Sequence, residues 1–349
     1  MAKSFPYIEA KGSNYQIGCA IGEHLKEKMR DYDARMKLLY SKLVKDSHHD
    51  LNVMAEKTEA LILKYFPQYL KELQGMADGS DLSLHEILLL CSEETLIETV
   101  KKGCTTFAYP CIEGIFLGHN EDWLLGYEDN MYIVKAKPKK GPAFLSLAYI
   151  GTLPGSSVAL NSCGIAFSGN SLLSGAQDGM PKNIILRSQI EAKNLEEFVD
   201  LASFSPRAIP NHTMAIDKNG KIVSVELALD RHCIVYTPRY FVHTNHALHP
   251  NLAMLEQGPV KNSAARYQTS LRHLLEKELN RDLAKRILRS HEHSPDSVCV
   301  HSKTDRVFPE DGHTSQTIAS AVVNIKNMTM SVAWGNPCKS KFKTYRLEF

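Results

Sequence analysis

The chain has 349 residues, of which 43% are hydrophobic and 23% are charged, and its formal net charge is +2 with histidine neutral. This length allows one large domain or two ordinary ones, and the composition excludes a disordered chain or a fibre. The nearly balanced charge gives no reason to expect nucleic acid or an anionic membrane as a partner. Because the N-terminus lacks the apolar core of a signal peptide and no apolar run is long enough to cross a bilayer, a soluble, cytoplasmic protein is expected.

Residues 13–100 show helical spacing of their apolar side chains. Two capping-box patterns, each a serine followed three residues later by glutamine or glutamate, mark helix starts at Ser13 and Ser83. Between them, a second helical stretch covers residues 54–74. The helical block is predicted to stop just before Cys104.

From Cys104 onward, short runs of strand-forming residues are divided by Gly, Pro and Asn. The first six runs are residues 104–110, 114–120, 130–137, 143–150, 156–161 and 164–170. The later part is predicted as a helical stretch at 183–201, strands at 212–217, 221–229, 233–237 and 240–246, a helical stretch at 263–290, and a hairpin at 315–335 that turns near Lys326. This order predicts one α+β domain, residues 1–349, with sheets packed between helical layers.

The eight cysteines are scattered without CxxC pairs, which indicates neither a zinc site nor a disulfide framework. Histidines occur close together at His48–His49, at His243 and His246, and in the HEH triplet at 291–293. None of these groups has a third ligand at a recurring spacing. We therefore predict no metal site.

Cys104 differs from the other cysteines because it follows Gly103 and precedes two threonines at the change from helical to strand-forming sequence. Attack of its thiol on the Gly103 carbonyl would form a thioester by an N-to-S acyl shift. Water would then release a chain that starts at Cys104. Glycine favours this step because it has no Cβ to obstruct the approach. The new terminus would carry a nucleophile and a free α-amine, whose pKa of roughly 7.7–8.0 suits a general base.

Three motifs extend this interpretation: GCTTF at 103–107, GHNEDW at 118–123 and HTNH at 243–246. With the YxxGxxxG pattern at 15–22 and the stretch NSAARYQTSLRHLL at 262–275, they resemble the acyl-coenzyme A:6-aminopenicillanic acid acyltransferase family of N-terminal nucleophile hydrolases. The matches occur in the family's order and span most of the chain.

The resemblance implies a four-layer αββα sandwich, the N-terminal nucleophile hydrolase fold, with a helical N-terminal segment. It also implies a precursor that cuts itself between Gly103 and Cys104. The products would be a mostly helical α chain, residues 1–103, and a β chain, residues 104–349, which stay associated as each other's partner.

The same resemblance assigns roles to individual residues. Cys104 corresponds to the nucleophile, Asp122 to the acidic residue that aids processing and orientation, and Asn245 to the side chain that donates an N–H to the oxyanion. Thr105, Asn120 and His246 are expected to support this site. Independently of the resemblance, Thr105 is expected either to contact the backbone of the nucleophile or to be a strand former only, and Asn120 to be a structural turn residue that supports the loop of Asp122.

Each assignment has an alternative. Cys104 could be a buried structural thiol, Asp122 a solvated acid in a turn, and Asn245 a strand-end asparagine that satisfies backbone groups. For the whole protein, one rival is an uncut hydrolase in which His246 activates Cys104, which needs the two side chains within hydrogen-bond reach. A second rival is a catalytically silent member of the family that acts as a binding module.

Family members transfer or hydrolyse acyl groups on amides, including penicillins, and relatives cleave β-alanyl amines. The resemblance therefore implies an enzyme that acts on a small-molecule amide or acyl donor through a thioester, with water or an amine as the acyl acceptor. No cofactor is expected, but acyl-coenzyme A is a possible acyl donor, and the basic run KPKK at 137–140 could meet its phosphates. An arginine found late in some members has no match here, since Gln316 lies near that position.

Overall fold

A computed structural model of the chain describes residues 3–46, 50–96, 103–172, 175–256, 260–302 and 315–348. The His48–His49 pair and residues 97–102 lie outside these ranges. Within them, no helix combines the length and the apolar character needed to cross a membrane.

Two β-sheets form the centre of the molecule. The first has the order β1-β4-β5-β6-β7-β8-β9-β10, with strands β1 (Tyr7–Gly12), β4 (Met131–Pro138), β5 (Phe144–Tyr149), β6 (Val158–Asn161), β7 (Ile165–Ser171), β8 (Asn211–Asp217), β9 (Ile222–Leu227) and β10 (His232–Thr237). The second has the order β11-β2-β3-β12-β13-β14, with strands β11 (Phe241–His243), β2 (Gly103–Cys111), β3 (Gly114–Leu124), β12 (Ser315–Asn324), β13 (Thr329–Trp334) and β14 (Lys343–Arg346). All strand pairs are antiparallel except β1 with β4.

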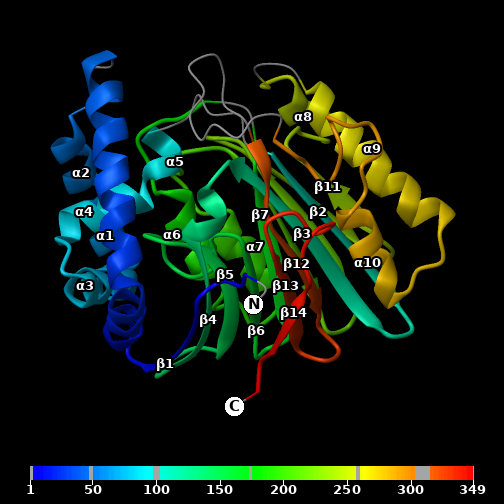
Figure 1. Cartoon of the computed structure of the whole chain (residues 1–349), viewed down its shortest axis with the longest axis horizontal. Coiled ribbons are helices and arrows are strands. Elements are labelled where there is room, and N and C mark those ends of the chain that lie inside the picture. The colour runs from blue at the N-terminus through cyan, green and yellow to red at the C-terminus, as the bar shows by residue number, and fades with distance from the viewer. Residues whose placement is uncertain are drawn as a thin grey trace.

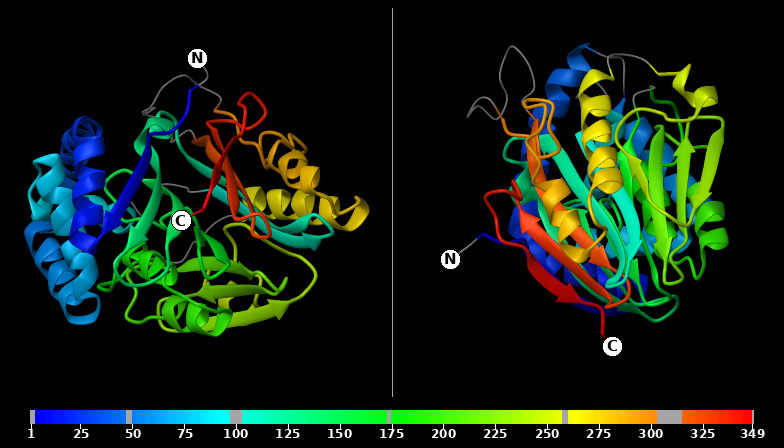
Figure 2. Two further views of the ribbon diagram at one scale, coloured as in Figure 1. Left: turned by 90° about the horizontal axis from the view of Figure 1, so that it is seen from below. Right: turned by 90° about the vertical axis from the view of Figure 1, so that its right-hand side faces the viewer.

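Helices cover the outer sides of both sheets (Figure 1). On the six-stranded sheet, α9 (Lys261–Glu276) and α10 (Arg281–Leu288) pack along β2 and β3, as both views in Figure 2 show. On the other sheet, α6 (Lys182–Gln189) and α7 (Leu195–Ala202) pack near β7, where the rings of Phe198 and Phe167 lie 5.4 Å apart. The order of layers is therefore the predicted αββα sandwich.

The N-terminal helices form a further group beside β1 and β4. They are α1 (Asn14–Asp46), α2 (Leu51–Tyr65), α3 (Pro67–Ser80), α4 (Leu84–Cys91) and α5 (Glu93–Leu96). The helices α1 and α3 are in backbone contact, because a Cβ placed on Gly18 would lie only 2.0 Å from the Glu72 carbonyl oxygen. Glycine is thus required there for close approach rather than for a turn.

Several predicted elements are confirmed. Capping-box hydrogen bonds occur at Ser13 and at Ser83, and the last hairpin turns between Asn324 and Thr329. Other predictions were too coarse. The stretches predicted as helical at 183–201 and 263–290 are each two helices with a break, and β1 and β14 were not foreseen. The short 3₁₀ helix η1 (Tyr127–Asn130) and the one-turn α8 (Pro250–Ala253) were not foreseen either.

Candidate active site around Cys104

Cys104 is the second residue of β2, directly after Gly103. In the ladder with β3, Gly103 pairs with Asp122 and Cys104 pairs with Glu121. Adjacent residues of a strand point to opposite faces of the sheet. The side chains of Glu121 and Asp122 therefore point to opposite faces of the sheet, and the Cys104 thiol lies on the same face as Glu121.

The Cys104 thiol is buried, with 4% of the residue exposed, and its Sγ donates to Glu121 Oε1 at 3.2 Å. The other oxygen of Glu121 accepts from Ser157 Oγ at 2.6 Å and lies 3.1 Å from His119 Nε2. Burial opposes ionisation of Glu121, but His119, Ser157 and Lys182 outweigh it and lower its pKa to about 2. Burial, reinforced by the neighbouring carboxylates, raises the pKa of the Cys104 thiol well above its usual value. In the uncut chain, Cys104 is therefore a neutral thiol that donates a hydrogen bond to the Glu121 carboxylate.

The backbone of Cys104 is held by Asn245 and Arg266. Its N–H donates to Asn245 Oδ1 at 2.7 Å. On α9, Arg266 donates from Nη1 to the Cys104 carbonyl oxygen and to Thr105 Oγ1, the latter at 3.0 Å. Its Nη2 donates to Asn245 Oδ1 at 2.8 Å. Because a guanidinium only donates, these contacts identify the Asn245 atom that faces Cys104 as the carboxamide oxygen.

Asn245 follows β11, at the end of an apolar strand as predicted, and lies directly beside Cys104. Its Nδ2, however, donates to the Ser171 carbonyl oxygen at 2.9 Å. In the uncut chain, the amide N–H of Asn245 thus points to the backbone of β7. Donation to an oxyanion stays a prediction for the cut enzyme.

Asp122 is buried on the face of β3 opposite to the thiol. Its Oδ1 accepts from Thr317 Oγ1 at 2.6 Å, whereas its Oδ2 has no hydrogen-bond partner among the described residues. A Cβ placed on Gly103 would lie 3.2 Å from this Oδ2. Burial raises the pKa of Asp122 to about 7, with a contribution from Glu121, although Arg266 and Thr317 lower it. The alternative that Asp122 is a solvated turn acid is wrong, because GHNEDW belongs to the buried strand β3 rather than to a loop.

His246 does not meet the requirement of the uncut-hydrolase rival. Its Nδ1 lies 2.8 Å from Ser263 Oγ and 3.2 Å from Thr244 Oγ1. Burial, and then the nearby His243, lower the pKa of His246 to about 4. Among the hydrogen bonds of the described residues, none joins His246 to Cys104.

The remaining supporting residues are structural. Thr105 accepts from Arg266, as described above. Asn120 donates from Nδ2 to the Leu288 and Val298 carbonyl oxygens at 2.9 and 2.8 Å and accepts from Ser320 Oγ at 2.5 Å. The prediction of a turn residue is wrong, because Asn120 lies in β3. It ties that strand to β12, to the last residue of α10 and to the segment after α10. Gln316 donates to Glu128 Oε1 at 3.3 Å.

Sequence reasoning did not assign a role to Glu121 or Arg266. Both lie inside motifs that carry the family resemblance, Glu121 in GHNEDW and Arg266 in NSAARYQ, so these motifs could have identified both as candidate site residues. The alternation of side chains along a strand separates Glu121 from Asp122, but only the register with β2 shows which of them meets the thiol.

Cys104, His119 and Glu121 bring a sulfur, a nitrogen and an oxygen within 4.8 Å of one another. These groups already have protein partners, since His119 Nδ1 lies 2.8 Å from Thr106 Oγ1 and Glu121 accepts from Ser157. We therefore assign this group to the thiol's hydrogen-bond network and not to a metal.

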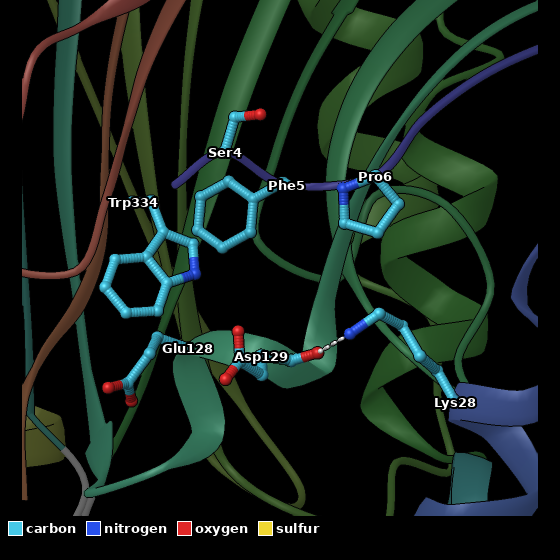
Figure 3. Close-up of a pocket in the computed structure, with 7 residues that line it drawn as sticks. All are labelled: Ser4, Phe5, Pro6, Lys28, Glu128, Asp129 and Trp334. Carbon is cyan, nitrogen blue, oxygen red and sulfur yellow. Dashed lines mark hydrogen bonds between the residues drawn. The ribbon is translucent and has the colours of Figure 1, made fainter. Parts of the chain in front are cut away.

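A cavity of about 280 Å³ lies elsewhere, between the start of the chain, η1 and β13 (Figure 3). Lys28 crosses one side of it and donates to the Asp129 carbonyl oxygen at 3.3 Å. Its lining is Ser4, Phe5, Pro6, Lys28, Glu128, Asp129 and Trp334. None of these residues contacts Cys104, Asn245 or Arg266 through a hydrogen bond in the described part of the chain, so we do not assign this cavity to the same site.

Comparison with known proteins finds a matching family and several similar proteins. The sequence profile of the family described as acyl-coenzyme A:6-aminopenicillanic acid acyl-transferase matches residues 112–339, a range that starts eight positions after Cys104. The chain is 22% identical over 342 residues to the acyl-coenzyme A:6-aminopenicillanic-acid-acyltransferase 40 kDa form of Emericella nidulans, covering 95% of this chain and 93% of that protein.

It is also 26% identical over 222 residues to the beta-alanyl-dopamine/carcinine hydrolase of Drosophila melanogaster. That match spans 56% of this chain and only 56% of the length of the hydrolase. Among solved structures, penicillin V acylase from Agrobacterium tumefaciens is 15% identical with a TM-score of 0.47, covering 66% of this chain and 83% of that chain.

Proposed function

The chain belongs to the acyl-coenzyme A:6-aminopenicillanic acid acyl-transferase family, and from this premise we propose that it is an autoprocessed N-terminal-cysteine enzyme. It breaks or remakes amide bonds through a thioester on Cys104. Its relatives named above are hydrolases and acyltransferases, which supports amide hydrolysis or acyl transfer as the reaction class.

The observation that carries the proposal is the environment of the Cys104 backbone nitrogen. In the uncut chain its single N–H donates to Asn245 Oδ1, and the unpartnered Asp122 Oδ2 lies against Gly103. A peptide nitrogen has one proton to donate, whereas a free α-ammonium has three. Asn245 Oδ1 and Asp122 Oδ2 can together accept more hydrogen bonds than the one N–H of the uncut Cys104 nitrogen can donate. This excess suits an α-ammonium on Cys104, the group that cleavage would produce.

Cleavage proceeds by attack of Cys104 Sγ on the Gly103 carbonyl carbon, loss of the C–N bond and protonation of the leaving nitrogen. Water then hydrolyses the thioester and leaves a carboxylate on Gly103 and a thiol on Cys104. The buried thiol is a weak nucleophile before cleavage, because burial and Glu121 raise its pKa. Glu121 positions the thiol through the 3.2 Å hydrogen bond.

In the cut enzyme, the α-amine takes the thiol proton and the thiolate attacks the substrate's carbonyl carbon. The amine of the substrate leaves with a proton, and the acyl group stays on Cys104 as a thioester. Water or a second amine then takes the acyl group and regenerates the thiol. Asn245 is the proposed N–H donor to the oxyanion in both halves of this cycle. Its Nδ2 would exchange the Ser171 carbonyl oxygen for the oxyanion, while its Oδ1 stays on the Cys104 nitrogen and on Arg266.

The two chains made by cleavage have contacts that would keep them together. β1 of the α chain pairs with β4 of the β chain from Tyr7 to Gly12. Glu72 forms a buried ion pair with Arg187 at 2.9 Å, and the partly exposed Glu94 forms an ion pair with the buried Lys182 at 2.6 Å. Dissociation would also expose apolar side chains of the α chain, such as Ile17, Leu25 and Leu73, which are buried in the main core, and the loss of this burial opposes it.

The proposed substrates are small amides, with β-alanyl amines and penicillin-type amides as the first classes to test because of the relatives' names. Acyl-coenzyme A is the proposed acyl donor if the enzyme transfers acyl groups. Lys139 and Lys140, which are exposed beyond the end of β4, are the proposed contacts for its phosphates.

The decisive experiment is the intact mass of freshly purified protein. Wild-type protein should consist of residues 1–103 and 104–349, which co-purify without a covalent link. Cys104→Ala should stay one chain and be inactive, and Cys104→Ser should be cut slowly because a hydroxyl is the weaker nucleophile. Cys111→Ala, a change of another cysteine in β2, is the matched control and should be cut and active.

Amide hydrolysis by a wild-type protein that stays one chain would contradict the N-terminal nucleophile mechanism and return attention to Cys104 and His246. A wild-type protein that stays one chain and acts on no amide or acyl-coenzyme A would favour a binding module. Release of free coenzyme A with and without an amine acceptor distinguishes transfer from hydrolysis.

A further inference from the structure

A second group of chemically active side chains lies outside the hydrogen-bond network of Cys104, in two segments far apart in sequence. His291, Cys299 and His301 lie in the segment that follows α10, and Cys338 lies in the turn after β13. One sulfur or nitrogen atom from each of the four lies within 4.8 Å of the other three.

Four of the six distances between these atoms are those of a tetrahedral metal site, and the other two, from His291 to the sulfurs, are within 4.8 Å. Cys299 Sγ and Cys338 Sγ are 3.6 Å apart, and His301 Nε2 lies 3.6 and 3.3 Å from them and 3.1 Å from His291 Nε2. With Zn–S bonds of about 2.3 Å and Zn–N bonds of about 2.0 Å, a tetrahedron has S–S, S–N and N–N edges of roughly 3.8, 3.5 and 3.3 Å. The observed edges differ from these by about 0.2 Å or less.

The types of ligand select zinc among common metals. Two thiolates and two imidazoles in a tetrahedral arrangement favour zinc, whereas calcium and magnesium require oxygen ligands. Both cysteines are free in the structure, so the group is not a disulfide. Asn336 lies behind it, donating from Nδ2 to the Val300 carbonyl oxygen at 2.6 Å and approaching Cys299 Sγ at 3.8 Å, as an outer partner of a metal ligand does.

From this geometry we infer that His291, Cys299, His301 and Cys338 bind one zinc ion. Binding displaces the protons of both thiols to solvent and forms two Zn–S and two Zn–N bonds. Four protein ligands leave no open position for water or substrate, so the site is structural rather than catalytic.

The zinc ion would fix the segment that supports Asp122. Val300 stands between two of the ligands, and its N–H donates to Thr317 Oγ1 at 2.9 Å. The Thr317 N–H donates back to the Val300 carbonyl oxygen at 3.0 Å, and Thr317 Oγ1 donates to Asp122 Oδ1 at 2.6 Å. The metal would therefore act on Asp122 through Val300 and through the backbone and hydroxyl of Thr317.

Metal content of the full-length protein, purified without a histidine tag and without added metal, tests this inference. Wild-type protein should contain about one zinc per chain, and zinc-edge X-ray absorption should show two sulfur and two nitrogen neighbours. Cys338→Ser and His301→Ala should lose most of the zinc. Cys163→Ser and His232→Ala, which change a partly buried cysteine and an exposed histidine elsewhere, are the matched controls and should keep it.

A second measurement needs no variant and covers the case in which a substitution prevents folding. In native wild-type protein, a zinc chelator should increase the labelling of Cys299 and Cys338 by a thiol reagent and leave Cys111 unchanged. Zinc well below one per chain, equal zinc in Cys338→Ser and Cys163→Ser, or a disulfide between Cys299 and Cys338 in peptide maps would each overturn the inference. None of these outcomes depends on cleavage at Cys104, so the proposed function is judged separately.

Discussion

Cys104 and Cys299 are both buried cysteines near the six-stranded sheet, yet their neighbours differ in kind. Around Cys104 lie one carboxylate that accepts from the thiol, and an asparagine and an arginine that hold the backbone. Around Cys299 lie a second thiol and two imidazoles, with no carboxylate among the four. In the proposed function, the first arrangement positions a single sulfur for attack on a carbonyl group. The second gathers electron-pair donors around a point. Neighbouring groups, and not burial, decide what each cysteine does.

The largest expected effect is that substitutions in the two regions change different properties of the protein. Cys104→Ala should abolish cleavage and turnover but keep its zinc, because none of the four proposed ligands is changed. Cys338→Ser should lose zinc but still be cut at Cys104, with turnover lowered about tenfold at most, since the metal acts on Asp122 only through Val300 and Thr317. Intact mass, turnover and metal content are measured on both variants. A Cys338→Ser protein that folds but stays uncut would show that cleavage at Cys104 depends on the proposed zinc site.

Asn245 sharpens the description of the Cys104 region, because its two ends have different roles. Asn245→Ala should lower turnover by about 10²–10³, the usual cost of an oxyanion donor. Asn245→Asp keeps an oxygen for the Cys104 N–H and for Arg266 but loses the amide N–H. It should therefore be cut and still turn over as slowly as the alanine variant.

Asn219→Ala, in an exposed turn, is the control for these two variants and should match the wild type. Near-normal turnover by Asn245→Asp would remove the N–H donor from the mechanism and leave Asn245 with the oxygen role seen in the uncut chain.

Asp122 gives a smaller effect with a characteristic pH dependence. Asp122→Asn should slow cleavage and turnover by up to about 10²-fold, because the register of the nucleophile is loosened. In the uncut Cys104→Ala protein, Asp122 has a pKa raised to about 7 by burial, with Arg266 and Glu121 as the charged groups beside it. The folded state then binds the proton more tightly than the unfolded state does. Its stabilising contribution is full below about pH 4 and is lost as the pH rises through about 7.

The free energy of unfolding of Cys104→Ala should thus fall more steeply between pH 4 and 7 than that of the Cys104→Ala/Asp122→Asn double variant. Denaturant unfolding at a series of pH values measures the difference. Parallel curves for the two proteins would mean that Asp122 is ionised in the folded chain throughout this range.

The smallest expected effect is that of Gly103→Ala. The added Cβ would lie 3.2 Å from Asp122 Cβ and Oδ2 and 3.6 Å from Arg266 Nη2, which is tight contact rather than a severe clash. Asp122 must shift by a few tenths of an ångström. We expect a loss of about 1 kcal/mol in stability and cleavage slowed several-fold. The rate is measured from the time course with which the 104–349 chain appears. Cleavage of Gly103→Ala at the wild-type rate would show that cleavage does not require a residue without a side chain at position 103.

Much of the fold was predictable, because local patterns carried it. The capping boxes at Ser13 and Ser83, the hairpin at Lys326 and the change from helix to strand at Cys104 all depend on residues within a few positions of one another. β1 was missed because it is only six residues long and its pairing partner β4 lies more than a hundred positions later. The breaks between α6 and α7 and between α9 and α10 were missed because helical spacing continues across them.

The sequence by itself determined which residue is the candidate nucleophile and where the chain would be cut, since a cysteine after glycine at a composition boundary is a local feature. It also placed Asp122 and Asn245 beside that residue through the family motifs. Only the tertiary structure decided that the thiol meets Glu121 while Asp122 lies on the other face. The antiparallel register of β2 and β3 sets that choice, and a shift of one residue would reverse it. Only the tertiary structure, likewise, brings Cys338 to Cys299 and the two histidines. Ligands from separate segments have no shared spacing for a sequence to display, and they meet because β13 ends beside the segment that follows α10.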